Sequence, residues 1–268
     1  MEELRFISFA SGSSGNAYYI GTLLQGIMID AGVSPRSLKK RMSAVGLSLQ
    51  AVLGVCVTHD HIDHISYVGS YGEKLGLPVY ATEQVHRGIV YNSSVKDKPG
   101  ASKRVFGKGA PFHLGPFTLT AFDIPHDGSD NVGYVVEYNG KTLVIATDLG
   151  HIPESLANYV ASANYLVLES NYDDFMLDSG PYPYQLKKRI RHDRGHLSNH
   201  IAAKFVAEHY HPKLSHLFLC HLSQTNNRPE LALKAVSEAL ANRGIKAGVD
   251  IEVHCLPRTK PSECFLLG

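Results

Sequence analysis

One seven-residue segment constrains this chain more than any other. Residues 58–64 read Thr-His-Asp-His-Ile-Asp-His and directly follow the apolar run 52–57. Such a run is typical of a buried strand that ends in a polar turn. Imidazole nitrogen and carboxylate oxygen are ligands for zinc, manganese or iron, and the segment has no cysteine to indicate a structural zinc site. It therefore predicts a metal site rather than a solvated loop that is rich in histidine.

Composition narrows the class of protein. The 268 residues are 44% hydrophobic and 19% charged, which suits one domain over residues 1–268 with a sizeable core. A net charge of +1 excludes a strongly basic nucleic-acid coat protein, so polyanion binding would need local patches and bound metal. The four cysteines form no CxxC pair, and neither a signal peptide nor a membrane-spanning run is visible. We expect a cytoplasmic protein with no membrane partner.

Polar residues also follow several other predicted strands. These residues are Asp30, His126, Asp148, Glu169 and His221, after the apolar segments 26–29, 117–123, 141–147, 165–168 and 217–220. One such residue is more often a cap or turn residue, but a series along one edge of a sheet would converge on one spot. For Asp30 and Glu169 we expect the role of orienting a ligand, because other residues already fill the metal's coordination sphere.

A serine- and glycine-rich segment, residues 11–16, follows a predicted first strand at 4–10. Its backbone amides could approach an anion closely, which makes Ser13, Ser14 and Asn16 candidate phosphate-binding residues. A plain hairpin turn is an equal alternative, because residues 17–20 have the pattern of a returning strand. Both interpretations stay open at this stage.

Two basic stretches stand out. Five cations occupy the eight residues before Gly195, and Lys188, Arg191 and Arg194 among them are candidate phosphate-binding residues. The second stretch, residues 91–111, has little periodicity and predicts a surface loop, with the edge of a nucleic-acid groove as the alternative.

A helix is predicted to follow the first of these stretches. Ser198 is a good N-cap, and the helix extends to about residue 210. Its predicted inward stripe consists of Ile201, Ala202, Phe205 and Val206. His196 thus lies just before a helix start, where backbone amides and the helix dipole favour an anion.

Further helices are predicted at residues 35–46 and 65–75 and from Pro229 onward, the last with Leu233, Val236 and Leu240 inward. Residues 133–138 and 141–147 predict a hairpin around the turn pair Asn139-Gly140.

The metal-site segment carries a family resemblance. The matching residues are His59, His61, Asp63 and His64, which fit the HxHxDH signature of the metallo-β-lactamase superfamily, and His126, Asp148 and His221, which follow in the order of its remaining ligands. The resemblance covers nearly the whole chain. It implies a mixed α/β fold, a four-layer αββα sandwich of two sheets face to face.

Shorter motifs resemble the YycJ/WalJ group of that superfamily. They are residues 11–16, 29–32, 169–171, 195–199 and 221–223, with Asn226 and Asn227. The resemblance implies a phosphodiesterase with 5′→3′ exonuclease action on DNA. Gly195-His196 before a helix is also similar to ribonuclease Z, an RNA-processing nuclease. Tyr172 and His200 depart from the group's pattern.

The resemblance implies two divalent metal ions, zinc or manganese, with iron also compatible. Its ligand sets are His59, His61 and His126 for one ion, and Asp63, His64 and His221 for the other, with Asp148 bridging. A hydroxide that bridges the metals would then act as nucleophile. Asp63 and His196 are the implied catalytic residues, with His196 donating to a phosphate or leaving oxygen unless it merely caps its helix.

Two other classes of function stay open. A hydrolase of small esters, thioesters or lactones would use the same ligands, and a silent metal-binding protein would keep them without turnover. The Gly-His pair and the basic run favour a nuclease with a nucleic acid, preferably DNA, as its partner.

Overall fold

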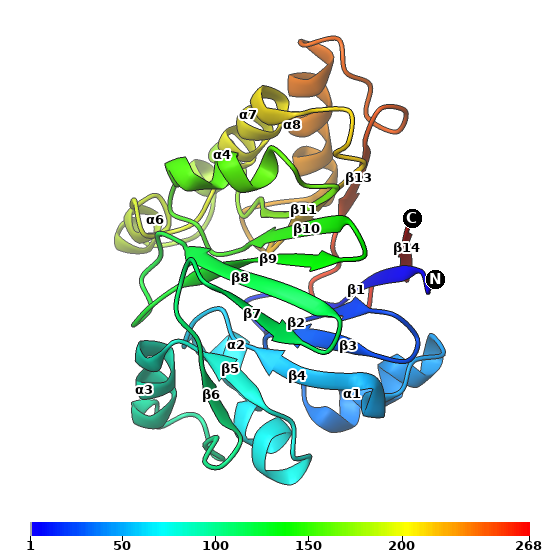
Figure 1. Cartoon of the computed structure of the whole chain (residues 1–268). Coiled ribbons are helices and arrows are strands. Elements are labelled where there is room, and N and C mark those ends of the chain that lie inside the picture. Colours follow the sequence, from blue (N-terminus) through cyan, green and yellow to red (C-terminus); the bar gives the residue numbers. More distant parts are fainter. Residues whose placement is uncertain (1) are drawn as a thin grey trace. The chain divides into compact units, whose positions relative to one another are not determined.

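The computed structural model describes residues 2–268, and the chain divides into two compact units (Figure 1). The first unit comprises the chain up to Ala121, Gly128–Val132 and Pro257–Gly268. The second comprises Phe122–Asp127 and Gly133–Leu256. Strands and helices occur in both, which confirms the predicted mixed α/β class. The single domain over residues 1–268 and the four-layer arrangement stay predictions.

One sheet of seven strands lies in the first unit. Its strands are β1 (Leu4–Gly12), β2 (Gly15–Gly21), β3 (Gly26–Ile29), β4 (Val52–Cys56), β5 (Val79–Ala81), β6 (Lys103–Val105) and β14 (Phe265–Leu267). They pair in the order β14-β1-β2-β3-β4-β5-β6. Pairing is antiparallel from β14 to β3 and parallel from β3 to β6. The C-terminal strand thus lies beside the N-terminal one (Figure 1).

Short helical segments connect these strands. They are α1 (Pro35–Ala44), a 3-10 turn (Leu49–Ala51), α2 (Ile62–Ile65), a π-helical turn (Ser70–Lys74) and α3 (Glu83–Tyr91). The regular helix predicted at 65–75 is wrong in its start, because α2 begins inside the metal-site segment. There His61 has the extended conformation of an N-cap, and Asp63 lies in the first turn, where a carboxylate is favoured by the helix dipole.

The basic stretch 91–111 is more ordered than a surface loop. It contains β6, and Lys103 forms an ion pair of 3.0 Å with Glu83 of α3. The Lys98 ammonium donates to the Ile89 carbonyl at 2.8 Å, and Val95 is buried. The loop prediction is wrong at residues 103–105, which pair in parallel with β5, whereas residues 92–102 and 106–110 form turns and irregular segments.

The second unit holds a sheet whose central strands are parallel. Its strands are β9 (Val132–Tyr138), β10 (Lys141–Ala146), β11 (Tyr165–Glu169), β12 (His216–Cys220) and β13 (Glu252–Cys255), and the hairpin of β7 (Pro111–Leu114) and β8 (Phe117–Asp123) precedes them in the chain. β9 and β10 are antiparallel, and β10 to β13 are parallel. Asn139 and Gly140 have φ of 49° and 74°, so the predicted tight hairpin is confirmed.

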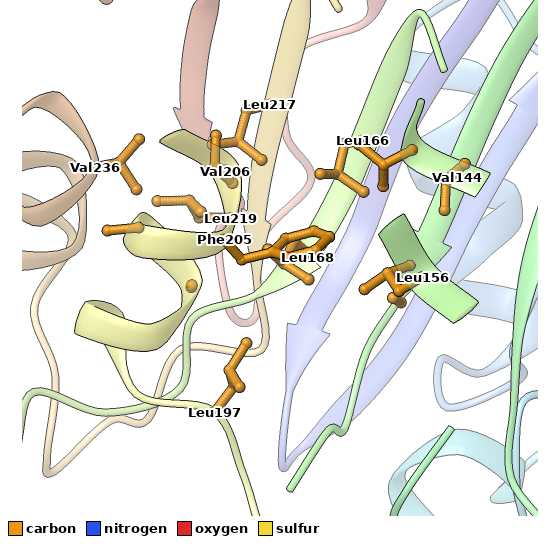
Figure 2. Close-up of a cluster of buried hydrophobic side chains, with 14 of the residues drawn as sticks. Val144, Leu156, Leu166, Leu168, Leu197, Phe205, Val206, Leu217, Leu219 and Val236 are labelled. Carbon is orange, nitrogen blue, oxygen red and sulfur yellow. The ribbon is translucent and has the colours of Figure 1, made fainter. Parts of the chain in front are cut away.

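Helices cover one face of this sheet (Figure 1). The helices of the second unit are α4 (Glu154–Val160), α5 (Asp174–Ser179), α6 (Tyr184–Ile190), α7 (Asn199–His209) and α8 (Pro229–Ala241). Figure 2 shows their core, in which alternate residues of β11 and β12, such as Leu166, Leu168 and Leu217, pack with side chains of α4, α7 and α8. No helix within residues 2–268 is long and apolar enough to cross a membrane.

The inward face of α7 differs from the predicted stripe at one residue. Ala202, Phe205 and Val206 are buried as predicted, but Ile201 is 42% exposed. Ile201 lies in the first turn of α7, where its backbone N–H donates to Ser198 Oγ at 3.3 Å. The four apolar residues cover a wide arc of the helix surface, so the sequence pattern alone does not define which residue at the edge of that arc faces solvent.

Alanine at Val206 and at Ile201 should therefore have different costs. We expect Val206→Ala to lower the free energy of unfolding by about 2 kcal/mol, because it removes buried methyl groups and leaves a cavity. Ile201→Ala should cost less than about 1 kcal/mol, as for a surface substitution. Urea denaturation of both variants checks this, and equal losses would contradict the assigned helix face.

Candidate metal centre

Each unit places candidate ligands at the carboxyl ends of neighbouring parallel strands. In the first unit Asp30 follows β3 and residues 58–64 follow the adjacent β4, with the Asp30 amide donating to the Cys56 carbonyl at 2.9 Å. In the second unit Asp148, Glu169 and His221 stand at the ends of β10, β11 and β12. Carboxyl ends of parallel strands share one sheet edge, so the members of each set lie together.

The histidines of the first unit are packed against one another. The ring centroids of His59 and His61 are 4.7 Å apart, and those of His59 and His64 are 4.1 Å apart. A carboxylate oxygen of Asp63 lies 3.6 Å from Nε2 of His64. Imidazoles at this spacing beside a carboxylate, two of them buried, are the donor set of a zinc, manganese or iron site.

Buried neighbours fix the proton of His64. Its Nδ1 lies 2.7 Å from an Asp30 oxygen, and its Nε2 lies 2.9 Å from the side-chain amide of Asn16. An amide NH₂ can only donate, so Nε2 presents its lone pair and Nδ1 carries the proton. In this structure Nε2 therefore accepts a hydrogen bond from Asn16, and a metal at Nε2 would have to replace that bond. The carboxylate at Nδ1 is a common partner of metal-bound histidine.

The Asp30 carboxylate is shared between this histidine and Thr58. The Thr58 amide donates to Asp30 at 2.8 Å and its hydroxyl at 3.1 Å, while the same hydroxyl lies 2.9 Å from Nδ1 of His59. Burial raises the pKa of Asp30, and the charge and hydrogen bond of His64 oppose that rise. These bonds are compatible with the predicted role of Asp30 in orienting ligands, which stays a prediction.

In the second unit four side chains bring donor atoms within 4.8 Å of one another: Asp148, Glu169, His196 and His221. Nδ1 of His221 is 3.2 Å from an Asp148 oxygen, and Nε2 of His126 is 3.9 Å from the same oxygen. Nδ1 of His126 donates to the Gly195 carbonyl at 2.9 Å. With Nδ1 protonated, Nε2 of His126 would be the nitrogen that binds a metal.

Glu169 is the hub of this set. It is fully buried and accepts from the amides of Leu149 at 2.7 Å and Leu197 at 3.1 Å. It also lies 2.8 Å from Nδ1 of His196 and 3.1 Å from Nδ1 of His221. Burial raises the pKa of Glu169, but the His196 charge and the hydrogen bonds outweigh it, and the pKa is lowered. Burial lowers the pKa of His196, and Glu169 more than reverses this.

Three of these strand ends are strained. Asp30, Asp148 and His221 have φ of 64°, 57° and 53°, and within residues 2–268 the only other non-glycine residue with positive φ is Asn139 in the hairpin turn. Such a conformation costs on the order of 1–3 kcal/mol per residue and is concentrated at functional sites. All three residues thus combine a strand end with a backbone conformation that side chains rarely adopt.

The serine- and glycine-rich segment forms a hairpin. β1 and β2 pair as far as Gly12 and Gly15, so that Ser13 and Ser14 form the exposed turn. Asn16 is buried, and besides His64 its amide contacts an Asp63 oxygen at 3.2 Å. Asn16 therefore holds the side chains of His64 and Asp63 by hydrogen bonds, whereas the two serines lie on the surface.

In the described part of the chain, some cations of the basic run before His196 form ion pairs with carboxylates of the protein, and others do not. Arg191 contacts Asp178 at 2.5 Å, which joins α6 to α5, and Arg189 contacts Asp127 at 2.7 Å. Lys188 and Arg194 line a depression of about 370 Å³ together with Asp127, Gln185, Arg189 and His192. Asp127 and Arg194 adjoin His126 and Gly195 in the chain, so this depression lies beside the second unit's ligands.

A buried polar network supports the second unit from behind and had no predicted role. Ser170 Oγ donates to Asn199 at 2.7 Å, and the Asn199 amide donates to Asn227 at 2.8 Å. The Asn227 amide donates to the carbonyls of Ser170 at 2.8 Å and Asn171 at 3.0 Å. The short motifs at 169–171, 195–199 and 226–227 thus join three loops that carry or flank ligands. Their clustering beside predicted strand ends is the sequence signal for such a role.

Comparison with known proteins agrees with this geometry. Residues 25–221 match the family described as Beta-lactamase superfamily domain. The chain is 34% identical over 251 residues to the exodeoxyribonuclease YycJ of Bacillus anthracis, covering 94% of each chain. It is 30% identical over 250 residues to the exodeoxyribonuclease WalJ of Streptococcus pneumoniae, covering 93% of each.

Solved structures agree in fold. The metallo-β-lactamase fold protein YhfI from Bacillus subtilis superposes with a TM-score of 0.70 at 17% identity, over 97% of this chain and 99% of that one. Zn(2+)-bound PqqB from Methylobacterium extorquens gives 0.69 at 16% identity, with the same two coverages. At such identities the likeness concerns the fold alone. With the family match and the two relatives, the chain belongs to the metallo-β-lactamase superfamily of metal-dependent hydrolases.

Proposed function

We propose that this chain is a cytoplasmic, metal-dependent exonuclease that degrades DNA in the 5′→3′ direction. The observation that carries the proposal is the series of strand-end ligands in a chain that is 34% identical, over 94% of its length, to an exodeoxyribonuclease. The orientation of the histidines supports it, because Nδ1 of His59, His64, His126 and His221 is each engaged by an oxygen.

The proposed cofactor is a pair of divalent ions, zinc or manganese. The proposed ligands are His59, His61 and His126 for one ion and Asp63, His64 and His221 for the other, with Asp148 shared. Two such ions lower the pKa of an attacking water and neutralise charge in an in-line displacement at phosphorus. Imidazole nitrogens and carboxylate oxygens are donors that suit that pair of ions.

In this proposal His196 supplies the proton. Its Nδ1 is held by Glu169 at 2.8 Å, which orients the ring, and the ring is only partly buried. The Glu169 carboxylate favours the imidazolium form and raises the pKa of His196, so Nε2 carries a proton that it can give to a phosphate oxygen or to the departing oxygen.

Phosphate contacts are proposed for the exposed cations and the hairpin turn. Lys188 and Arg194 make no ion pair within residues 2–268, so they can meet a phosphate without first breaking one. Ser13 and Ser14 can donate from the turn. For Arg191 we propose an indirect contribution, because its bond to Asp178 already holds α6 in place.

A cleavage assay tests the proposal. We expect 5′-labelled DNA to be degraded from its 5′ end by the purified protein with added manganese or zinc, and chelation with EDTA to abolish this. The assay uses single- and double-stranded DNA and RNA, each labelled at either end. Turnover of lactones or thioesters without any cleavage of nucleic acid would contradict the proposal, and internal cleavage of RNA would instead favour a ribonuclease Z type activity.

A further inference from the structure

A second surface depression lies beside the metal-site segment of the first unit. It has a volume of about 480 Å³, and its lining residues are Asp60, Gln84, Arg87, Gly88, Tyr91, Asn92 and Ser129. Asp60 stands between the ligands His59 and His61, so one wall of the depression belongs to the metal-site segment itself. The opposite wall is α3, which lies at the β6 end of the sheet (Figure 1).

The floor of the depression is fixed to the metal-site segment. The Asp60 carboxylate accepts from the amide of Ser129 at 3.0 Å and from its hydroxyl at 2.5 Å. Asn92 donates to the Asp60 carbonyl at 3.4 Å. A Cβ at Gly88 would lie 1.8 Å from an oxygen of the Asp60 side chain, so a larger residue there would displace the Asp60 carboxylate from its bonds to Ser129. A ligand on α3 would therefore be held in a set position relative to His59 and His61.

The rim offers groups that the fold leaves unused. Tyr91, at the end of α3, is 84% exposed, so its ring face is open to a flat ligand. The Arg87 side chain is 70% exposed, with a 3.7 Å contact to Glu83, whose carboxylate already binds Lys103 at 3.0 Å. Gln84 adds an amide beside them.

This combination suits one class of ligand. A nucleobase has a flat face that stacks on a tyrosine ring and polar edges that an amide can meet, and the neighbouring phosphate attracts a guanidinium. We propose that this depression binds an unstacked nucleobase of the substrate strand next to the scissile phosphate, with Tyr91 as the stacking platform. The inference rests on the proposed nuclease function and adds the recognition of single-stranded nucleic acid to it.

The test compares ordinary and abasic DNA. We expect Tyr91→Ala to raise the Kd for a 5′-labelled single-stranded oligonucleotide about 10-fold, within the range for loss of one stacked base, and to raise KM in parallel. For the same oligonucleotide with abasic sites at its first three positions, Tyr91→Ala should raise the Kd by less than about 2-fold. Fluorescence anisotropy in manganese with an oligonucleotide whose linkages are phosphorothioates, which resist hydrolysis, gives Kd for the metal-loaded protein, and steady-state kinetics with the ordinary oligonucleotide give KM.

Two further variants sharpen the comparison. Tyr91→Phe keeps the ring and should stay within about 2-fold of the unmodified protein, whereas Phe175→Ala removes another exposed aromatic, on α5, and should leave both constants unchanged. If Tyr91→Ala weakened the binding of ordinary and abasic DNA equally, the inference would be overturned. It would also be overturned if Tyr91→Ala bound DNA as the unmodified protein does but had a different mass in light scattering, which would assign Tyr91 to a contact between protein chains. If the unmodified protein cleaves nothing, the proposed function fails, but the anisotropy comparison still decides whether Tyr91 stacks on a base.

Discussion

Asp63→Ala is expected to lower the rate of metal-dependent DNA hydrolysis by at least about 10²–10³-fold. The proposed role of Asp63 is to hold a metal that stabilises charge at the reacting phosphate, and losing such a group has effects of this size. Bound metal should fall as well, because His64 would lose the carboxylate that lies 3.6 Å from its Nε2. Single-turnover kinetics and elemental analysis measure the two effects.

The matched control is the neighbouring position. Ile62 lies in the same segment and is 40% exposed, and it serves as a spacer between ligands. Ile62→Ala should keep metal content and rate within about 3-fold, while circular dichroism shows that both variants fold. Full activity of Asp63→Ala would contradict the assignment of Asp63 as a metal ligand. The proposed division of the ligands between two metals would then have no support.

Glu169→Ala should have the largest effect on stability. The carboxylate is fully buried and takes four hydrogen bonds, from two backbone amides and two histidines. Removing one partner of such a buried charged cluster costs about 3–5 kcal/mol. For a chain of this size that corresponds to a fall in Tm of about 10 °C, which thermal denaturation measures.

Two variants separate this effect from a general loss of a glutamate. Glu137→Ala removes an exposed carboxylate from β9 of the same sheet and should shift Tm by less than about 2 °C. Glu169→Gln keeps the volume but turns an NH₂ toward donors, so we expect most of the loss to remain. Wild-type stability of Glu169→Gln would mean that the four contacts contribute little.

Much of the fold could be predicted because strand ends and turns have local signals. The apolar segments before Asp30, Asp148 and His221 are strands, and Asn139-Gly140 forms the hairpin, since each depends on a few adjacent residues. Strands and helices alternate along the second half of the chain, and this order favours parallel pairing of the strands. Parallel pairing places Asp148, Glu169 and His221 at one edge of the sheet.

The parts that escaped prediction depend on contacts between distant segments. Ile201 fits an apolar helix stripe, but its exposure depends on what packs against α7. The strand at 103–105 has no periodicity of its own and forms by pairing with β5. The engagement of Arg191 by Asp178, which separates it from Lys188 and Arg194, likewise needs two helices in register.

The left-handed backbone at Asp30, Asp148 and His221 has a consequence for how this protein can change over evolutionary time. Glycine would adopt those conformations without strain, so selection for stability alone favours the one residue that carries no side chain. At each of these three positions the protein therefore keeps a functional side chain at a cost in stability. In a related protein that no longer hydrolyses a substrate, we expect these three residues to be among the first to be replaced by glycine. Glycine at all three positions would therefore indicate a relative without hydrolase activity.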